Sequence, residues 1–207
     1  MNVIVEMPPQ AMALLVLAHG AGAGMAHPFM TSLAKALAGE GIGTLRYQFP
    51  YMDAGKKRPD PPKVLTAAVA AAVAEARARQ PKLPLFAGGK SMGSRMTTTA
   101  AAEGKIPEIR GIVCYGFPLH PAKELATSRA AHLAKVEIPT LFLQGTRDDL
   151  ADLELMRGVV SSLKSHMRMH VVEGADHGFG ILKSSGRTAA AVLSELAAET
   201  RRFIASV

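Results

Sequence analysis

Apolar runs rich in Val, Ile and Leu alternate with Ala-rich stretches of helical periodicity along almost the whole chain. This alternation is typical of βα units and of a mostly parallel sheet. Most of the apolar runs are nearly continuous, as strands buried on both faces are. The pattern predicts strands at Val3 to Glu6, Leu14 to Ala18, Gly43 to Tyr47, Pro84 to Ala87, Gly111 to Tyr115, Thr140 to Gln144 and Met167 to Val172.

Helices are expected between these strands, and two of them begin at a proline, which the first turn of a helix tolerates. The longest irregular segment is Gln48 to Pro61, and a loop of that length in a compact domain is usually functional or disordered. The predicted helices are Pro28 to Ala38, Pro62 to Arg79, Met92 to Glu103, Leu150 to Leu163 and Gly186 to Ile204. The fold class is therefore α/β, with helices on both faces of a mostly parallel sheet.

Length and composition fit one soluble domain spanning residues 1–207. With seven Phe, three Tyr and no Trp, the core has to be built mainly from aliphatic residues and Met. Cys114 is the only cysteine, which excludes an intramolecular disulfide and a Cys-rich zinc site. A reducing compartment is the natural interpretation.

The longest early apolar run, Ala11 to Ala18, is far shorter than the roughly 20 residues that cross a bilayer, and no basic segment precedes it. We therefore expect neither a membrane span nor a signal peptide, and a cytoplasmic protein. The net charge of +7 comes from scattered residues, with Lys56 to Arg58 as the only run of three cations. We interpret them as a solvated surface and expect no nucleic-acid or membrane partner.

Candidate chemistry begins at Gly89 to Gly93, a G-x-S-x-G motif placed where a predicted strand turns into a predicted helix. This is the context of a nucleophile elbow, in which the serine projects above the sheet. Side chains two residues to either side would collide with neighbouring backbone, which explains the glycines. Ser91 is the candidate nucleophile; its simpler interpretation is a helix N-cap.

Two later strand ends supply the partners that a serine nucleophile needs. The strand at Thr140 to Gln144 leads to Asp148, and the strand at Met167 to Val172 leads to His177. Carboxyl ends of parallel strands meet at one edge of a sheet, so we expect Ser91, Asp148 and His177 to lie together there. Histidine then acts as the base and aspartate holds its tautomer.

The oxyanion of an acyl-transfer intermediate needs two backbone donors. The Met92 N–H, at the start of the helix after the elbow, is one candidate. The second is the Ala21 N–H, in the glycine-rich loop at residues 19–22, because glycines let the backbone approach a substrate closely.

Four motifs together resemble a small α/β-hydrolase: H-G-A-G at residues 19–22, G-K-S-M-G at 89–93, G-T-R-D at 145–148 and D-H-G-F at 176–179. They are similar to dienelactone-hydrolase-like enzymes and closer still to the subgroup that includes testis-expressed protein 30. Segments 47–52 and 115–121 resemble the same subgroup. The resemblance implies an α/β-hydrolase fold without a separate cap domain, and it favours Asp148 over Asp149 as the acid. Ser91 stands where true dienelactone hydrolases have a cysteine, so their substrate is not carried over.

We expect a carboxylesterase-like serine hydrolase that cleaves a carboxylic ester or thioester of a small molecule through an acyl-enzyme. The alternative is a binding or scaffold protein that has kept the fold without catalysis. The seven histidines lack metal-ligand spacing, and the glycines lack a nucleotide-binding fingerprint, so we expect no metal and no cofactor. Oligomeric state stays open.

The cations at strand ends suggest a substrate preference. Lys56, Lys57, Arg58, Lys90 and Arg147 all follow predicted strands or adjoin the proposed triad. If these cations surround the opening of the active site, their positive potential steers anionic substrates toward it, and we then expect an anionic substrate.

Overall fold

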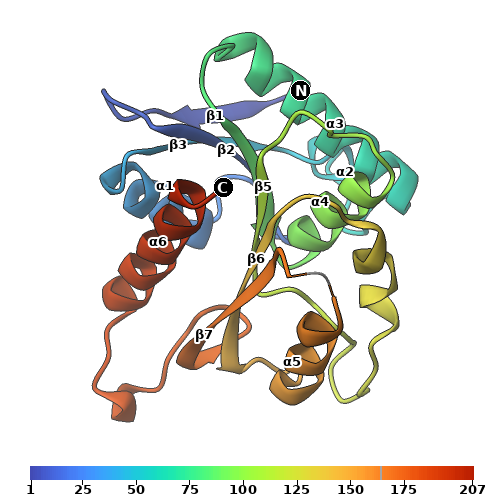
Figure 1. Cartoon of the computed structure of the whole chain (residues 1–207), viewed down its shortest axis with the longest axis vertical. Coiled ribbons are helices and arrows are strands. Elements are labelled where there is room, and N and C mark those ends of the chain that lie inside the picture. Colours follow the sequence, from blue (N-terminus) through green and yellow to red (C-terminus); the bar gives the residue numbers. More distant parts are fainter. Residues whose placement is uncertain (164) are drawn as a thin grey trace.

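The computed structural model describes residues 1–163 and 165–207, and it is built on one seven-stranded sheet with the strand order β1-β3-β2-β4-β5-β6-β7 (Figure 1). The strands are β1 (Val3–Glu6), β2 (Ala13–Ala18), β3 (Ile42–Tyr47), β4 (Leu85–Lys90), β5 (Gly111–Tyr115), β6 (Thr140–Arg147) and β7 (Met167–Asp176). β1 pairs antiparallel with β3, and every other neighbouring pair is parallel. The predicted α/β class and mostly parallel sheet are confirmed.

Helices cover both faces of this sheet (Figure 1). One face carries α1 (Pro28–Gly39) and α6 (Ala189–Ala205), and the other carries α3 (Pro62–Arg79), α4 (Met92–Ala102) and α5 (Leu153–Ser162). Three shorter elements complete the chain: α2 (Pro50–Asp53) and the 3-10 helices η1 (Ser128–Lys135) and η2 (Lys183–Ser185). None of the helices in the described residues is both long and apolar enough to cross a bilayer.

The core is divided between the two faces by the alternation of side chains along the strands. On β2, Leu14 and Val16 pack with residues of α3 and α4, whereas Leu15 and Leu17 pack with residues of α1 and α6. All six residues of β2 are buried. A strand in this central position has no solvent-facing side, which is why its sequence is apolar throughout.

Strand ends differ from the sequence-based expectation, and so do the starts of α5 and α6, each of which begins three residues later than predicted. β4, β6 and β7 continue three or four residues further than predicted, through Lys90, Arg147 and Asp176. The glycines of β4 stay in the parallel ladder, since Gly88 and Gly89 pair with residues of β5. α5 begins at Leu153 because the Asp152 side chain accepts a hydrogen bond from Leu155 N–H and caps the helix there.

Candidate active site

Ser91 occupies a sharp turn between the end of β4 and the start of α4. Its φ of 51° and ψ of −116° put a non-glycine residue in a strained region of backbone space. A Cβ on Gly89 would lie 2.7 Å from the carbonyl oxygen of Ala18, and one on Gly93 would lie 2.5 Å from the same atom. The collisions predicted from the sequence are therefore confirmed; they come from Ala18 on β2, the strand next to the elbow, and for Gly89 also from the backbone of Gly93 at 2.6 Å.

Ser91, His177 and Asp148 are brought together in one hydrogen-bonded chain. The Nε2 atom of His177 lies 2.8 Å from Ser91 Oγ, and its Nδ1 atom lies 2.9 and 2.8 Å from the two carboxylate oxygens of Asp148. With a proton on Nδ1, the ring donates to Asp148 and leaves Nε2 free to accept the serine proton. The Asp148 side chain is 0% exposed, whereas the neighbouring Asp149 is exposed and takes no part.

Two further groups hold the Asp148 carboxylate in place. Leu150 N–H donates to Oδ1 at 2.8 Å, and the side-chain amide of Gln144 donates to Oδ2. Gln144 is fully buried on β6, and its own Oε1 accepts from Phe117 N–H at 3.0 Å. Gln144 was not predicted as a site residue, although a lone amide directly after the apolar run Leu141 to Leu143 is a signal in the sequence.

The loop after β2 is ordered by the segment that follows β3. His19 is fully buried, with Nδ1 2.7 Å from Gly20 O and Nε2 accepting from Phe49 N–H at 3.1 Å. Burial lowers the pKa of His19, which keeps its ring neutral at pH 7 and suits one donor and one acceptor bond. Tyr51 OH accepts from Gly22 N–H at 3.1 Å. These contacts fix the backbone that carries Ala21.

The two backbone donors expected for an oxyanion, Ala21 N–H and Met92 N–H, both lie beside Ser91. Each residue lines a hollow together with the serine. Met92 is in the first turn of α4, where amides lack acceptors within the helix. Within the described residues neither N–H donates to another backbone or side-chain acceptor. Both amides are therefore free to bind an oxygen atom of a ligand.

Lys90 precedes the serine and lines a hollow with it, as predicted, but its ammonium group is buried. Nζ is buried, has no hydrogen-bond acceptor in the described part of the chain and lies 5.4 Å from the centre of the Phe179 ring. A Cβ on Gly116 would be 3.0 Å from Nζ and 3.6 Å from Asp148 Oδ2, so the ammonium lies on the carboxylate side of the triad. Burial lowers the pKa of Lys90 to about 8, against the opposing charges of Asp148 and Asp176.

Two hollows open beside Ser91, and Ala21, Ser91 and Leu150 line both. The α1-side hollow, about 350 Å³, is further lined by residues that include Phe29, Met30 and His177. The α4-side hollow, about 430 Å³, is further lined by Pro59, Asp60, Pro62, Leu65, Met92, Arg95, Met96, Pro118 and Arg129. A bond held at Ser91 would therefore have room for a substituent on each side.

The remaining predicted mouth cations lie elsewhere. Lys56, Lys57 and Arg58 are exposed and line hollows that contain no residue of the triad. Arg147 is exposed and donates to Gly174 O at 3.3 Å. None of these four cations lines either hollow beside Ser91, although the hollow of Lys56 and Arg58 shares Pro59, Asp60 and Pro62 with the α4-side hollow.

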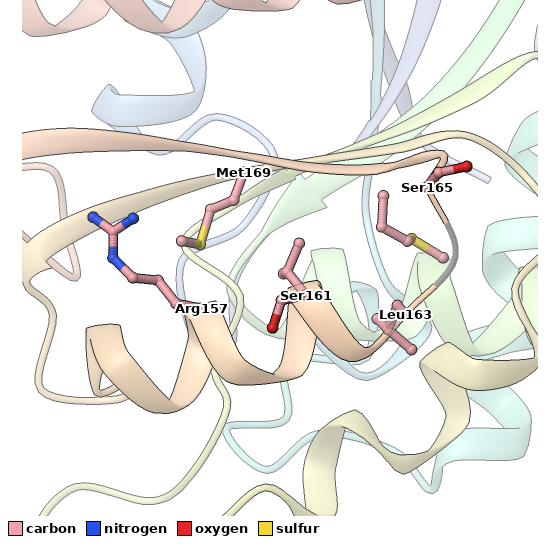
Figure 2. Close-up of a pocket in the computed structure, with 7 residues that line it drawn as sticks. Arg157, Ser161, Leu163, Ser165 and Met169 are labelled. Carbon is pink, nitrogen blue, oxygen red and sulfur yellow. The ribbon is translucent and has the colours of Figure 1, made fainter.

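A further hollow of about 400 Å³ lies between α5 and β7 and shares no residue with the two beside Ser91 (Figure 2). Arg157 and Ser161 line it from α5, Leu163 lines it from the position directly after that helix, and Met169 lines it from β7. Among the described residues there is no group of three His, Cys, Asp or Glu placed to hold a metal ion.

Comparison with known proteins gives a family match over nearly the whole chain. A family model described as an alpha/beta hydrolase domain matches residues 11–205. An alpha-beta serine hydrolase homologue from Coxiella burnetii is similar in structure, with a TM-score of 0.76 at 22% identity, covering 97% of this chain and 89% of that one.

Two other solved structures are similar to the same extent. Dienelactone hydrolase from Anabaena variabilis has a TM-score of 0.75 at 19% identity, covering 99% of this chain and 90% of that one. A serine hydrolase without a lid from Xanthomonas campestris has a TM-score of 0.75 at 20% identity, covering 97% and 88%. At these identities the structures establish a shared fold.

Proposed function

Because this chain belongs to the alpha/beta hydrolase domain family, we propose that its Ser91 site is that of a serine hydrolase. The substrate is a small molecule with a carboxylic ester or thioester bond, and the reaction passes through an acyl-enzyme. The observation that carries this proposal is the hydrogen-bonded chain from Ser91 Oγ through His177 to Asp148, with both links at 2.8 to 2.9 Å.

Acylation begins when Ser91 Oγ attacks the carbonyl carbon of the substrate. His177 Nε2 takes the hydroxyl proton as the new carbon–oxygen bond forms, and the buried Asp148 carboxylate stabilises the resulting imidazolium. The oxygen of the tetrahedral intermediate carries the negative charge and accepts hydrogen bonds from Ala21 N–H and Met92 N–H. Collapse of the intermediate expels the alcohol or thiol, which receives the proton held on Nε2.

Deacylation repeats these steps with water as the nucleophile. His177 removes a proton from a water molecule, which attacks the acyl carbon and forms a second tetrahedral intermediate at the same two N–H groups. Collapse then returns the proton to Ser91 Oγ and releases the acid. The strained turn at Ser91 supports this role, because strain of this kind persists where the surrounding structure holds it for function.

Two finer expectations from the sequence accompany the proposal. The motif resemblance favours the subgroup of testis-expressed protein 30 and a carboxylesterase-like specificity. Cys114 is the only cysteine of the chain and is buried, which favours a location in the reducing cytoplasm.

The test is covalent labelling with a fluorophosphonate probe, followed by kinetics on matched ester, thioester and amide substrates. Wild-type protein should be labelled, Ser91→Ala should not, and Ser91→Ala should lose on the order of 10³-fold or more in turnover. Ser162→Ala is the matched control, because Ser162 is exposed on α5 and lines neither hollow beside Ser91. A folded wild-type protein that the probe never labels would instead be a binding or scaffold protein.

A further inference from the structure

Arg95 and Arg129 converge on the α4-side hollow from two different elements. Arg95 lies on α4, four residues after Ser91, and Arg129 lies on η1. Both side chains are half-buried and line the hollow that also contains Ser91 and Met92. A hydrogen bond of 2.8 Å between Thr98 Oγ1 and His132 Nε2 ties α4 to η1 and fixes the two elements relative to each other.

These two guanidinium groups differ from the other arginines that the fold withdraws from solvent. Arg46, Arg77 and Arg187 are buried or half-buried, and each donates hydrogen bonds to carbonyl, hydroxyl or carboxylate oxygens. Within the described residues, neither Arg95 nor Arg129 has a side-chain hydrogen bond or an ion pair. A guanidinium carries five donors, so a half-buried pair without acceptors has unused binding capacity.

The charges around the pair favour a negative ligand. The pKa of Arg95 is lowered first by burial and then by the charge of Arg129, so the two cations repel each other. The neighbouring His132 neither adds to nor offsets this positive charge at pH 7, because burial and then the charge of Arg95 lower its pKa to about 4 and leave its ring neutral. Asp60 is the acid on the lining, and it forms no ion pair with either arginine in the described structure. One positive charge of the lining is therefore left uncompensated.

We propose that Arg95 and Arg129 form an anion-binding subsite. It selects substrates whose acyl part ends, away from the reacting bond, in a carboxylate or a phosphate-type group. This inference rests on the proposed function, since the subsite gains its meaning from the reacting bond at Ser91. The two arginines bind the distal oxyanion through charge-assisted hydrogen bonds while the ester carbonyl lies at Ser91 Oγ. The bond broken and the protons moved are those of the hydrolysis already described.

The first experiment measures binding without turnover, so it is independent of catalysis. Glutarate and inorganic phosphate are titrated by calorimetry into the Ser91→Ala protein, and then into the same protein carrying Arg95→Gln, Arg129→Gln or both. Each arginine replacement should weaken binding of the preferred anion by about tenfold or more, the range for a hydrogen bond to a charged group. The anion bound more tightly identifies the carboxylate or phosphate source.

The second experiment measures specificity in the protein with Ser91 intact. The substrates are the para-nitrophenyl esters of pentanoate, glutarate and phosphonobutanoate, which share the leaving group and the chain length. The ratio of kcat/KM for the preferred anionic ester to that for the pentanoate ester should exceed one. It should fall by about tenfold or more in the double variant, mainly through KM, because the arginines bind the ground state and transition state alike.

Arg110→Gln is the matched control, since Arg110 is exposed, has no side-chain partner in the described residues and lines neither hollow beside Ser91. It should leave both the anion affinity and the kcat/KM ratio unchanged. The proposal is overturned if the double variant binds both anions as its parent does, or if the wild-type ratio does not exceed one. If the wild-type protein hydrolyses none of the esters but still binds an anion through the two arginines, the proposed hydrolase function is wrong and the anion-binding subsite stands.

Discussion

Replacing Lys90 with methionine should make the protein more stable at pH 7, although it removes a residue adjacent to Ser91. Methionine has a similar length and no charge, so it leaves no ammonium to desolvate. In the native protein that ammonium is buried without a hydrogen-bond acceptor among the described residues, and Phe179 is its ring contact. The charges of Asp148 and Asp176 offset only part of the cost of burial.

The size of the effect follows from the pKa of Lys90, which burial lowers from 10.5 to about 8. That difference corresponds to about 3 kcal/mol of stability lost while the lysine is charged. Below pH 8 both native and unfolded chains hold the proton, so the full cost applies. Between pH 8 and 10.5 the unfolded chain keeps a proton that the native protein has released, and the stability of the wild type rises with pH.

The assay is urea unfolding of wild type and Lys90→Met at pH 7 and pH 10, with the free energies of unfolding compared at each pH. The variant should be more stable by up to about 3 kcal/mol at pH 7, and most of that difference should vanish at pH 10. Lys82→Met is the control, because Lys82 is exposed and its replacement should change little at either pH. A variant that is less stable at pH 7, or a difference that does not depend on pH, would refute this reasoning.

Two further predictions concern the elbow and the acid. Gly93→Ala should destabilise the fold by about 3 kcal/mol or more, since the new Cβ would lie 2.5 Å from the Ala18 carbonyl oxygen. Gly39→Ala, whose Cβ meets no atom within 4 Å, should leave the melting temperature equal or higher. Asp148→Asn should lower kcat for a para-nitrophenyl ester by on the order of 10⁴, while Asp149→Asn should change it little. A larger loss for Asp149→Asn would move the acid to the exposed neighbour.

The bounds of several elements were predictable from local pattern alone. β1, β5 and α3 have the ends that the sequence predicts. Their limits coincide with a proline or with the end of an apolar run, so the signal and the physical cause lie in the same few residues. β6 and β7 extend further than expected because their last residues, including Arg147 and Asp176, pair with each other across a register shift. Pairing between two strands leaves no pattern within the sequence of either one.

The residues of the candidate site also fall into those that sequence pattern could predict and those that it could not. Ser91, Asp148 and His177 were found from motif and strand order, because a parallel sheet places the carboxyl ends of its strands along one edge. Gln144 was missed, since its role depends on two hydrogen bonds of its side-chain amide, one to the Asp148 carboxylate and one from Phe117 N–H in a different loop. Side-chain direction, which decides such contacts, is set by packing.

The sequence by itself determined the α/β class, the order of the elements and the approach of three polar residues to one rim, because these follow from periodicity, glycine placement and the direction of parallel strands. Tertiary structure decided where the charges act. It buried the Lys90 ammonium, left Lys56, Lys57 and Arg58 outside the two hollows beside Ser91 and brought Arg95 and Arg129 to one hollow. The energy and the protonation of a charged side chain depend on the surrounding dielectric and on neighbours from other elements. Both are set only when helices and loops pack on the sheet.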